Sequence, residues 1–213
     1  MIKLKKIYES LLDEEYPPEF DMEVFKGLNS FNKRIKYCQA KLYRISSGSS
    51  RIVYRIDDEK VLKLARNQKG LAQNEVEIDH GSEQFLKDVV ANVFDSHPNN
   101  LWVEMELARK VNINDFKRIT GFNWEDFVAA IHNYGNRNGG RYQSTMDVDK
   151  EIVEQMWEDE FVYDIFSYIG NYDLPSGDFE KLSSFGIVTR NGADHLVVID
   201  FGFTNDVKKT HYS

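Results

Sequence analysis

Three short segments between Lys41 and Ala65 have the pattern of consecutive β-strands, and this pattern constrains the fold more than any other feature. KLYRIS, RIVYRID and KVLKLA alternate or cluster β-branched and aromatic residues over the length of a strand. SGSS separates the first two segments, and the acidic turn Asp57-Asp58-Glu59 separates the second from the third. Because such short linkers join neighbouring antiparallel strands, the sequence predicts an antiparallel meander.

A helix and two further strands follow the meander. The segment from about Gly70 to Lys87 has apolar residues at helical spacing, and the stretch from Val89 to Ala108 reads as two strands joined at Pro98-Asn99-Asn100. The N-terminal half is therefore predicted as a five-stranded sheet with one helix inserted between its third and fourth strands.

The C-terminal half is predicted to be mainly helical, which gives an α+β fold class. Helical spacing covers residues 112–121, 123–135 and one long helix over 147–172. A β-hairpin follows over residues 186–202, turned by Asn191-Gly192. Before the sheet, residues 1–14 read as an amphipathic helix and residues 21–40 as a helical stretch interrupted near Asn29.

Composition excludes several classes of protein. The 213 residues suffice for one sizeable domain or two small lobes around a cleft. The formal net charge of −8 argues against bulk binding of nucleic acid. No apolar run approaches the ~20 residues that cross a bilayer, so no membrane partner is expected. The single Cys38 cannot form an internal disulfide, which favours a reducing compartment such as the cytoplasm.

The stretch LVVIDFGFT places Asp200 where an apolar strand opens into a turn. An aspartate at such a position holds a metal ion in some proteins, and in others it caps the turn. The apolar strand VLKLA raises a related question about Lys63, because a lysine in a strand buried on both faces needs a partner. Lys60 lies beside the same strand, so alternation alone does not choose between the two lysines.

The order of these elements resembles the protein-kinase fold. A glycine-containing hairpin, a lysine on the third strand, a glutamate-bearing helix, two strands, helices and a hairpin ending in Asp-Phe-Gly follow one another as in that family. The text SSGSSRIVYRIDDEKVLKLARNQKGLAQNEVEIDH also resembles the small kinase-like proteins encoded by tailed bacteriophages. The resemblance covers about residues 43–204. It implies a helical N-terminal extension (1–40), an N-lobe (41–106) and a C-lobe (107–213), truncated because eleven residues follow Gly202.

The resemblance implies a role for each matching residue in the N-lobe. Gly48 matches the middle glycine of the nucleotide loop, so Gly48 and Ser49 are expected to cradle phosphate through their backbone. Lys63 matches the lysine that holds nucleotide phosphates, and Glu77 its helix partner. Glu75 is the alternative glutamate, and the phage resemblance favours Glu77.

The C-lobe residues match the protein-kinase pattern less completely than those of the N-lobe. Asp200 matches the aspartate that chelates Mg²⁺. No His-Arg-Asp occurs, and Asp173 and Asp178 both compete for the place of the catalytic aspartate. We prefer Asp178, because Ser184 then falls near the position of the metal-binding asparagine. In either alignment the asparagine itself is missing.

Two functions are compatible with this pattern. The first is an atypical ATP-dependent phosphotransferase that uses Mg-ATP in a cleft between its lobes. The second is a pseudokinase, a non-catalytic binding, regulatory or phage structural module. The expected partners are a nucleotide and a protein substrate or protein partner. The expected location is the cytoplasm, which for a phage protein is that of the host cell, or else the virion.

Overall fold

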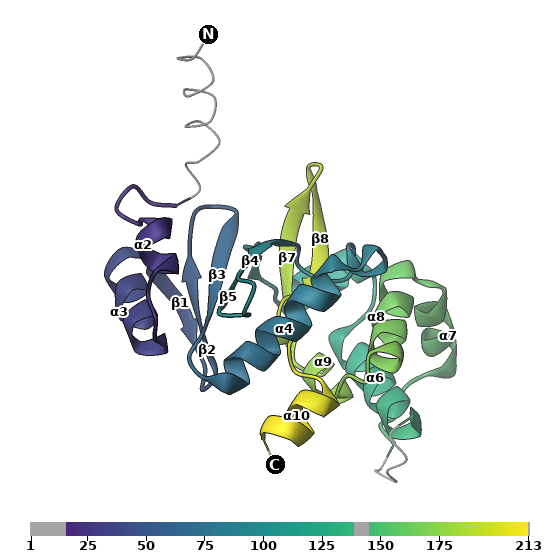
Figure 1. Cartoon of the computed structure of the whole chain (residues 1–213). Helices are drawn as coiled ribbons and strands as arrows, with labels where there is room; N and C mark the ends of the chain where they lie inside the picture. The colour runs from purple at the N-terminus through teal and green to yellow at the C-terminus, as the bar shows by residue number, and fades with distance from the viewer. Residues whose placement is uncertain (1–15, 139–144, 213) are drawn as a thin grey trace. The chain divides into compact units, whose positions relative to one another are not determined.

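The computed structural model describes residues 16–138 and 145–212, so the amphipathic helix expected over residues 1–14 lies outside the described residues. The described chain divides into two compact units (Figure 1). Among the described residues, unit 1 contains residues 16–74 and 93–107, and unit 2 contains residues 75–92, 108–138 and 145–212.

Unit 1 is built on a five-stranded antiparallel sheet, as the sequence predicts. The strand order is β1-β2-β3-β5-β4. The meander pairs Val53 of β2 with Lys63 of β3, and Lys63 in turn with Val103 of β5. The five strands are β1 (Tyr43–Ser47), β2 (Arg51–Arg55), β3 (Lys60–Ala65), β4 (Val93–Ser96) and β5 (Trp102–Glu106).

Two helices cover one face of this sheet. Helices α2 (Met22–Lys26) and α3 (Phe31–Lys41) are separated at Asn29-Ser30, where the Ser30 hydroxyl oxygen accepts a hydrogen bond from Lys33 N. Figure 1 shows both beside the sheet, and their buried side chains share one core with it. That core contains Phe20, Phe25, Cys38, Leu42, Ile52, Tyr54, Ile56, Leu62, Leu64 and Trp102.

The tyrosine that precedes these helices also contacts the sheet. The Tyr16 hydroxyl donates a 2.5 Å hydrogen bond to Oε1 of Glu104, a buried carboxylate on β5. Residues from Tyr16 onward thus belong to the packing of unit 1. The domain boundaries expected from the sequence stay predictions.

Helix α4 (Gln68–Ser82) follows β3, and the division between the units falls within it, after Asn74. The sequence predicts one helix to about Lys87. Instead α4 ends at Ser82, and a short 3₁₀ turn, η1 (Gln84–Leu86), follows.

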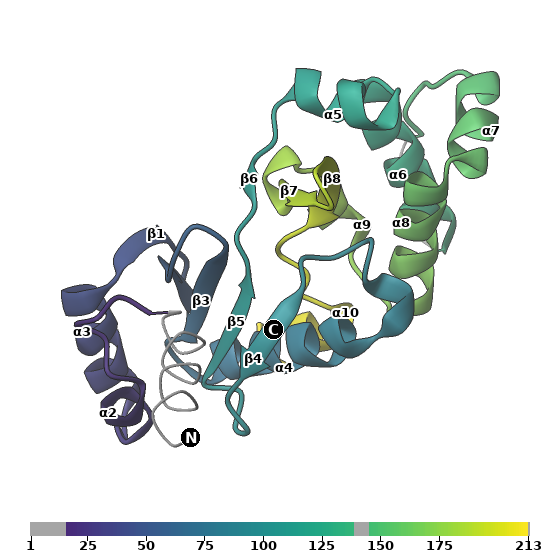
Figure 2. The same cartoon turned by 90° about the horizontal axis from the view of Figure 1, so that it is seen from above.

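In unit 2, a β-hairpin lies among helices. Asn191 and Gly192 have φ of 52° and 78°, the left-handed pair that a tight hairpin turn requires, as predicted. Figure 2 shows the hairpin among the helices of this unit. Phe185 on the hairpin contacts the rings of Trp124 and Phe127. The elements are β6 (Arg109–Lys110), β7 (Phe185–Arg190), β8 (Ala193–Val198), α5 (Ile113–Thr120), α6 (Trp124–Asn138), α7 (Lys150–Glu158), α8 (Glu160–Asn171), α9 (Ser176–Phe179), η2 (Leu182–Ser184) and α10 (Asn205–His211).

The long helix expected over residues 147–172 is wrong, because Asp159 divides it into α7 and α8. Asp159 has extended backbone angles (φ −79°, ψ 126°), and its Oδ1 accepts a hydrogen bond from Val162 N at 3.0 Å. An aspartate at this N-cap position satisfies an otherwise unpaired donor of the new helix.

None of the helices within the described residues combines the length and apolar character that a bilayer crossing requires.

Candidate functional site

The loop of the β1–β2 hairpin, Gly48–Ser50, is held by its carbonyl oxygens. The Arg66 guanidinium donates to Gly48 O at 2.6 Å, Asn67 Nδ2 to Ser49 O at 3.0 Å, and Arg66 N to Ser50 O at 2.8 Å. Gly48 N donates back to Arg51 O at 2.9 Å. Among the described residues, nothing accepts a hydrogen bond from the backbone N–H of Ser49 or Ser50.

Gly48 itself is not required by the shape of this loop. A Cβ added there would meet only Arg51 O, at an ordinary 3.7 Å, and its φ lies outside the left-handed region. A side chain would therefore fit, and the turn alone does not explain the glycine. Gly70, at the start of α4, is different, because its Cβ would lie 2.3 Å from Ser50 O. Only a glycine allows this close approach.

Lys63 lies in the middle of β3 and is 6% exposed. Strand alternation places its side chain on the same face of the sheet as those of Val61 and its cross-strand neighbours Val53 and Val103. Lys60 belongs to the opposite face, where its ammonium lies 5.2 Å from the centre of the Phe94 ring. The two lysines that the sequence could not separate are thus distinguished by face and by burial.

The candidate glutamates on α4 differ in the same way. Glu77 is fully buried, whereas Glu75 is exposed to solvent. Glu83 lies beyond the end of the helix and is also exposed. A carboxylate is rarely buried without a partner or a function, so burial distinguishes Glu77 from the two exposed glutamates.

Asp200 follows β8, and the structure corrects the expectation that it lies at a buried strand end. Leu196, Val197 and Val198 are buried, but β8 ends at Val198 and Asp200 is exposed. The next residue, Phe201, is 2% exposed and lies against the rings of His80 and Tyr168. The Asp-Phe-Gly segment therefore buries the Phe201 side chain and exposes Asp200 to solvent.

The His80 imidazole anchors this same cluster. His80 Nδ1 and the hydroxyl of buried Tyr168 are 2.7 Å apart. Burial lowers the pKa of His80, although the carboxylates of Asp79, Glu83 and Glu77 act in the opposite direction. The C-terminal part of α4, helix α8 and the Asp-Phe-Gly segment are therefore packed together within unit 2.

The segment between α8 and β7 brings Asp178, Lys181 and Ser184 together. Lys181 Nζ donates to Asp178 Oδ1 at 2.6 Å, and the Ser184 hydroxyl donates to the Asp178 carbonyl at 2.6 Å. The hydrogen bond to Asp178 raises the pKa of Lys181, and nearby Asp200 and Glu180 add to the shift. Ile199 N donates to Ser184 O at 2.8 Å, so the segment before β7 and the segment after β8 lie side by side.

Asp173 has a different environment from Asp178. It has a left-handed backbone (φ 50°), its Oδ1 accepts from Asn205 Nδ2 at 3.0 Å, and its carbonyl accepts from Asn205 N at 3.1 Å. These contacts tie the end of α8 to the start of α10. The choice between Asp173 and Asp178 as the catalytic aspartate stays a prediction.

Metal ligation by a cluster of side chains has no support within residues 16–138 and 145–212. No three His, Cys, Asp or Glu side chains there are arranged to hold a metal ion.

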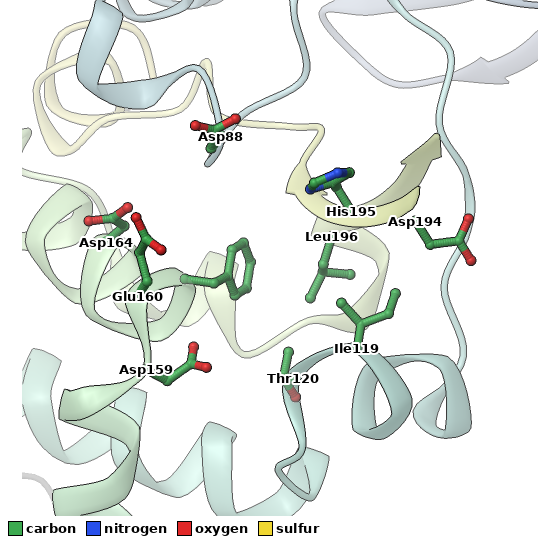
Figure 3. A pocket seen from close by; sticks show the side chains of 10 residues that line it. Asp88, Ile119, Thr120, Asp159, Glu160, Asp164, Asp194, His195 and Leu196 are labelled. Atoms are coloured by element: carbon green, nitrogen blue, oxygen red, sulfur yellow. The ribbon is translucent and has the colours of Figure 1, made fainter. Parts of the chain in front are cut away.

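An acidic cavity of about 520 Å³ lies elsewhere in unit 2, near the turn end of the hairpin (Figure 3). Burial raises the pKa of Asp164, and the carboxylates of Glu160 and Asp88 add to the rise. The Asp194 carboxylate instead accepts hydrogen bonds from Arg118 at 2.8 Å and Arg109 at 2.7 Å, which lower its pKa. None of the predicted site residues lines this cavity. Its walls are Asp88, Ile119, Thr120, Asp159, Glu160, Phe161, Asp164, Asp194, His195 and Leu196.

The structure therefore groups the predicted site residues by unit. Gly48, Ser49 and Lys63 belong to unit 1, and Glu77, Asp178, Ser184 and Asp200 belong to unit 2. Sequence reasoning missed Lys181, Arg66 and Asn67, each of which contacts a predicted site residue. The sequence indicates the role of Lys181 only through its spacing, because it follows Asp178 by three residues.

Comparison with known proteins gives only distant structural likenesses. No protein-family model matches the chain, and no curated protein matches its sequence. The streptomycin–ATP complex of aminoglycoside phosphotransferase APH(2'')-IIa is 13% identical and has a TM-score of 0.37, covering 82% of this chain and 71% of that one. The ADP-bound aminoglycoside phosphotransferase APH(2'')-Ib is 14% identical with a TM-score of 0.33, covering 82% and 71%.

SAICAR synthase from Saccharomyces cerevisiae, complexed with SAICAR, is 9% identical with a TM-score of 0.39, covering 78% of this chain and 74% of that one. TM-scores this low do not bear on activity. The narrower resemblance to phage proteins stays a prediction.

Proposed function

We propose that the chain is an ATP-dependent phosphotransferase of the protein-kinase-like type. The observation that carries this proposal is the junction at the open end of the β7–β8 hairpin. The hydrogen bond from Ile199 N to Ser184 O joins the two segments that bear Asp178 and Asp200. Lys181 interacts electrostatically with both carboxylates. A proton-accepting aspartate and a metal-binding aspartate on adjoining segments are what phosphoryl transfer requires.

The nucleotide would be held mainly by groups of unit 1. The N–H groups of Ser49 and Ser50 are available to an anionic phosphate, and Lys63 supplies a positive charge. Glu77 would orient the Lys63 ammonium. The proposal requires these groups and Asp200 of unit 2 to act on a single nucleotide.

Asp200 is suited to hold Mg²⁺, because it is exposed just after the buried end of β8 and Mg²⁺ prefers oxygen ligands. When bound, the metal ion neutralises phosphate charge. Ser184 is a weaker ligand for the second position. Its hydroxyl already donates to Asp178 O, so only the remaining electron pairs of its oxygen could take part.

Asp178 is assigned to the acceptor side of the reaction. Its carboxylate would accept or orient the proton of the substrate hydroxyl. Lys181 holds that carboxylate in place through the 2.6 Å hydrogen bond. We infer a hydroxyl-bearing acceptor, a protein substrate being one candidate.

A second candidate function is a pseudokinase that binds nucleotide or protein without transfer. The engagement of both Asp178 and Ser184 within their own loop favours it, because that loop then lacks an open oxygen ligand at the asparagine position. Phage origin and a location in the host cytoplasm or the virion remain predictions, and both are compatible with either candidate function.

A thermal-shift titration with ATP, with and without Mg²⁺, tests the proposal on the wild type and on Asp200→Asn. A ligand at 100 times its dissociation constant stabilises the native state by about 2.7 kcal/mol. For a chain of this size that corresponds to roughly 5–10 °C in Tm. A Mg²⁺-dependent rise that Asp200→Asn abolishes is the expected result. No rise at saturating ATP would reject nucleotide binding, and a rise without transfer of the γ-phosphate to any acceptor would favour the pseudokinase.

A further inference from the structure

We propose that Arg66 and Asn67 are positioning residues that hold the Gly48–Ser50 loop in a conformation ready to receive phosphate. This inference rests on the proposed function and adds to it the residues that shape the phosphate-binding loop. Arg66 and Asn67 are the two residues between β3 and α4, and together they bind three successive carbonyl oxygens of the loop.

Each of the three contacts has good hydrogen-bond geometry. The distances to Ser49 O and Ser50 O are 3.0 and 2.8 Å, within the ordinary range, and the distance from the charged Arg66 guanidinium to Gly48 O is 2.6 Å, slightly shorter than that range. With the carbonyls engaged, the unpaired polar groups of the loop backbone are the N–H donors of Ser49 and Ser50. A loop with fixed carbonyls and available donors suits an anion and disfavours a cation.

Asn67 also connects the loop to α4. Its Oδ1 accepts from Gly70 N at 3.2 Å while its Nδ2 donates to Ser49 O. Ser50 extends the connection, because its hydroxyl donates to Gln73 Oε1 at 2.9 Å. One side chain thus fixes both the start of the helix and the loop.

Gly70 makes this arrangement possible. A methyl group at this position would lie 2.3 Å from Ser50 O, a backbone atom that cannot move without displacing the loop. The glycine is therefore explained by the approach of the helix to the loop. Holding the loop in advance removes an ordering cost that a mobile loop would incur on binding phosphate.

Two variants isolate the role of Arg66 and Asn67. Asn67→Ser keeps a helix-capping oxygen but removes the donor to Ser49 O. Arg66→Lys keeps the positive charge but removes the guanidinium geometry. Arg55→Lys is the matched control, because Arg55 lies at the far end of β2 and binds Asp57 O and Asp58 instead.

The first measurement is amide hydrogen exchange of the ligand-free protein, followed by NMR. In the wild type, Gly48 N and Arg66 N are hydrogen-bonded to Arg51 O and Ser50 O. Losing one side-chain hydrogen bond to the loop should loosen it and raise the exchange of these two amides about five- to tenfold in Asn67→Ser and Arg66→Lys, with β3 unchanged. Unchanged exchange at Gly48 and Arg66 would overturn the proposal.

The second measurement is the dissociation constant of ATP, by calorimetry at fixed Mg²⁺. We expect it to rise about tenfold in Asn67→Ser and Arg66→Lys and to stay unchanged in Arg55→Lys. Equal affinity in the wild type and both variants would overturn the positioning role even if the loop exchanges faster. A wild type that binds no ATP would instead reject the proposed function, and hydrogen exchange alone would then decide whether Arg66 and Asn67 hold the loop.

Discussion

At the scale of single residues, the contacts around Asp173 and Asp178 separate two acids that look alike in the sequence. Asp173 accepts two hydrogen bonds from Asn205 and has a left-handed backbone. Asp178 instead forms an ion pair with the exposed side chain of Lys181. An exposed ion pair of this kind contributes about 0–1 kcal/mol to stability. The Asp178–Lys181 pair is therefore better explained by orientation of the carboxylate than by stability of the fold.

Substitution of each aspartate by asparagine tests this distinction. Asp178→Asn should retain ATP binding and lose transfer by about 10²–10⁴-fold, the usual worth of a general base. Asp173→Asn keeps an oxygen acceptor for Asn205, and asparagine tolerates a left-handed backbone, so its transfer rate and Tm should stay near those of the wild type. Single-turnover transfer with labelled ATP gives the comparison. Loss of transfer in Asp173→Asn alone would mean that the loop is wrongly aligned.

The raised pKa of Asp164 gives a second test at this scale, through pH. A carboxyl group whose folded pKa lies above its unfolded value begins to destabilise the fold as the pH rises past the unfolded pKa, and does so fully above the folded pKa. Glu160 precedes Asp164 by one helical turn, and like charges at that spacing cost about 0.2–0.5 kcal/mol. Asp164→Asn should therefore raise the free energy of unfolding by that amount at pH 7. The gain should vanish below the ordinary pKa of 3.8.

Urea unfolding of the wild type and Asp164→Asn at pH 7 and pH 3.5 measures this gain. Glu154→Gln, on α7, is a control carboxylate outside the acidic cavity. A stabilisation by Asp164→Asn that persists unchanged at pH 3.5 would contradict the electrostatic explanation.

At the scale of the elements, the sequence predicts those whose pattern is repeated and local. The meander is visible because each strand carries its own β-branched and aromatic residues and each turn its own polar residues. The break at Asp159 was missed because apolar spacing continues across it. Its one local signal is an aspartate three residues before Val162, whose backbone it caps.

Nothing in the local sequence of β6 predicts a strand. Its two residues, Arg109 and Lys110, are exposed and charged, and they form a strand only because they pair with Ile187 and Gly186 of β7. The contacts of Arg66 and Asn67 are likewise tertiary. Reading a loop residue as a hydrogen-bond donor to a loop some 18 residues earlier requires the fold first.

The packing of α4 against α8 through His80 leads to a prediction at this scale. His80 is held by the Tyr168 hydroxyl and by the rings of Tyr172 and Phe201, and burial lowers its pKa. A group with a depressed folded pKa stabilises the fold above its unfolded pKa, and that contribution is lost as the pH falls through the folded value. The free energy of unfolding should therefore decrease on acidification below the ordinary pKa of 6.5.

His80→Phe preserves a ring of similar size and cannot be protonated. Between pH 7.5 and pH 5, its urea midpoint should change less than that of the wild type. His211→Phe, which alters a histidine on the C-terminal helix α10, is the control. Equal slopes for the wild type and His80→Phe would show that His80 does not titrate in this range.

At the scale of the whole molecule, the proposed function depends on two units acting on one ligand. Lys63 is a buried cation of unit 1, and Asp200 is an exposed carboxylate that follows the hairpin of unit 2. If both contact the same Mg·ATP, removing either should abolish most of the binding, and removing both should add little. If each acted at a site of its own, the two losses would add.

A double-mutant cycle therefore tests the central claim of the proposal. Lys63→Met retains the apolar stem of the buried lysine, and Asp200→Asn retains the shape of the carboxylate. We expect each single variant to weaken Mg·ATP binding at least about tenfold and the double variant to be no weaker than the worse single one, a coupling free energy of about 1–3 kcal/mol. Lys60→Met, on the other face of β3, should bind as the wild type does. If calorimetric titrations show that the two losses of binding free energy simply add, Lys63 and Asp200 do not contact the same nucleotide. That result would contradict the proposal that both units bind one Mg·ATP.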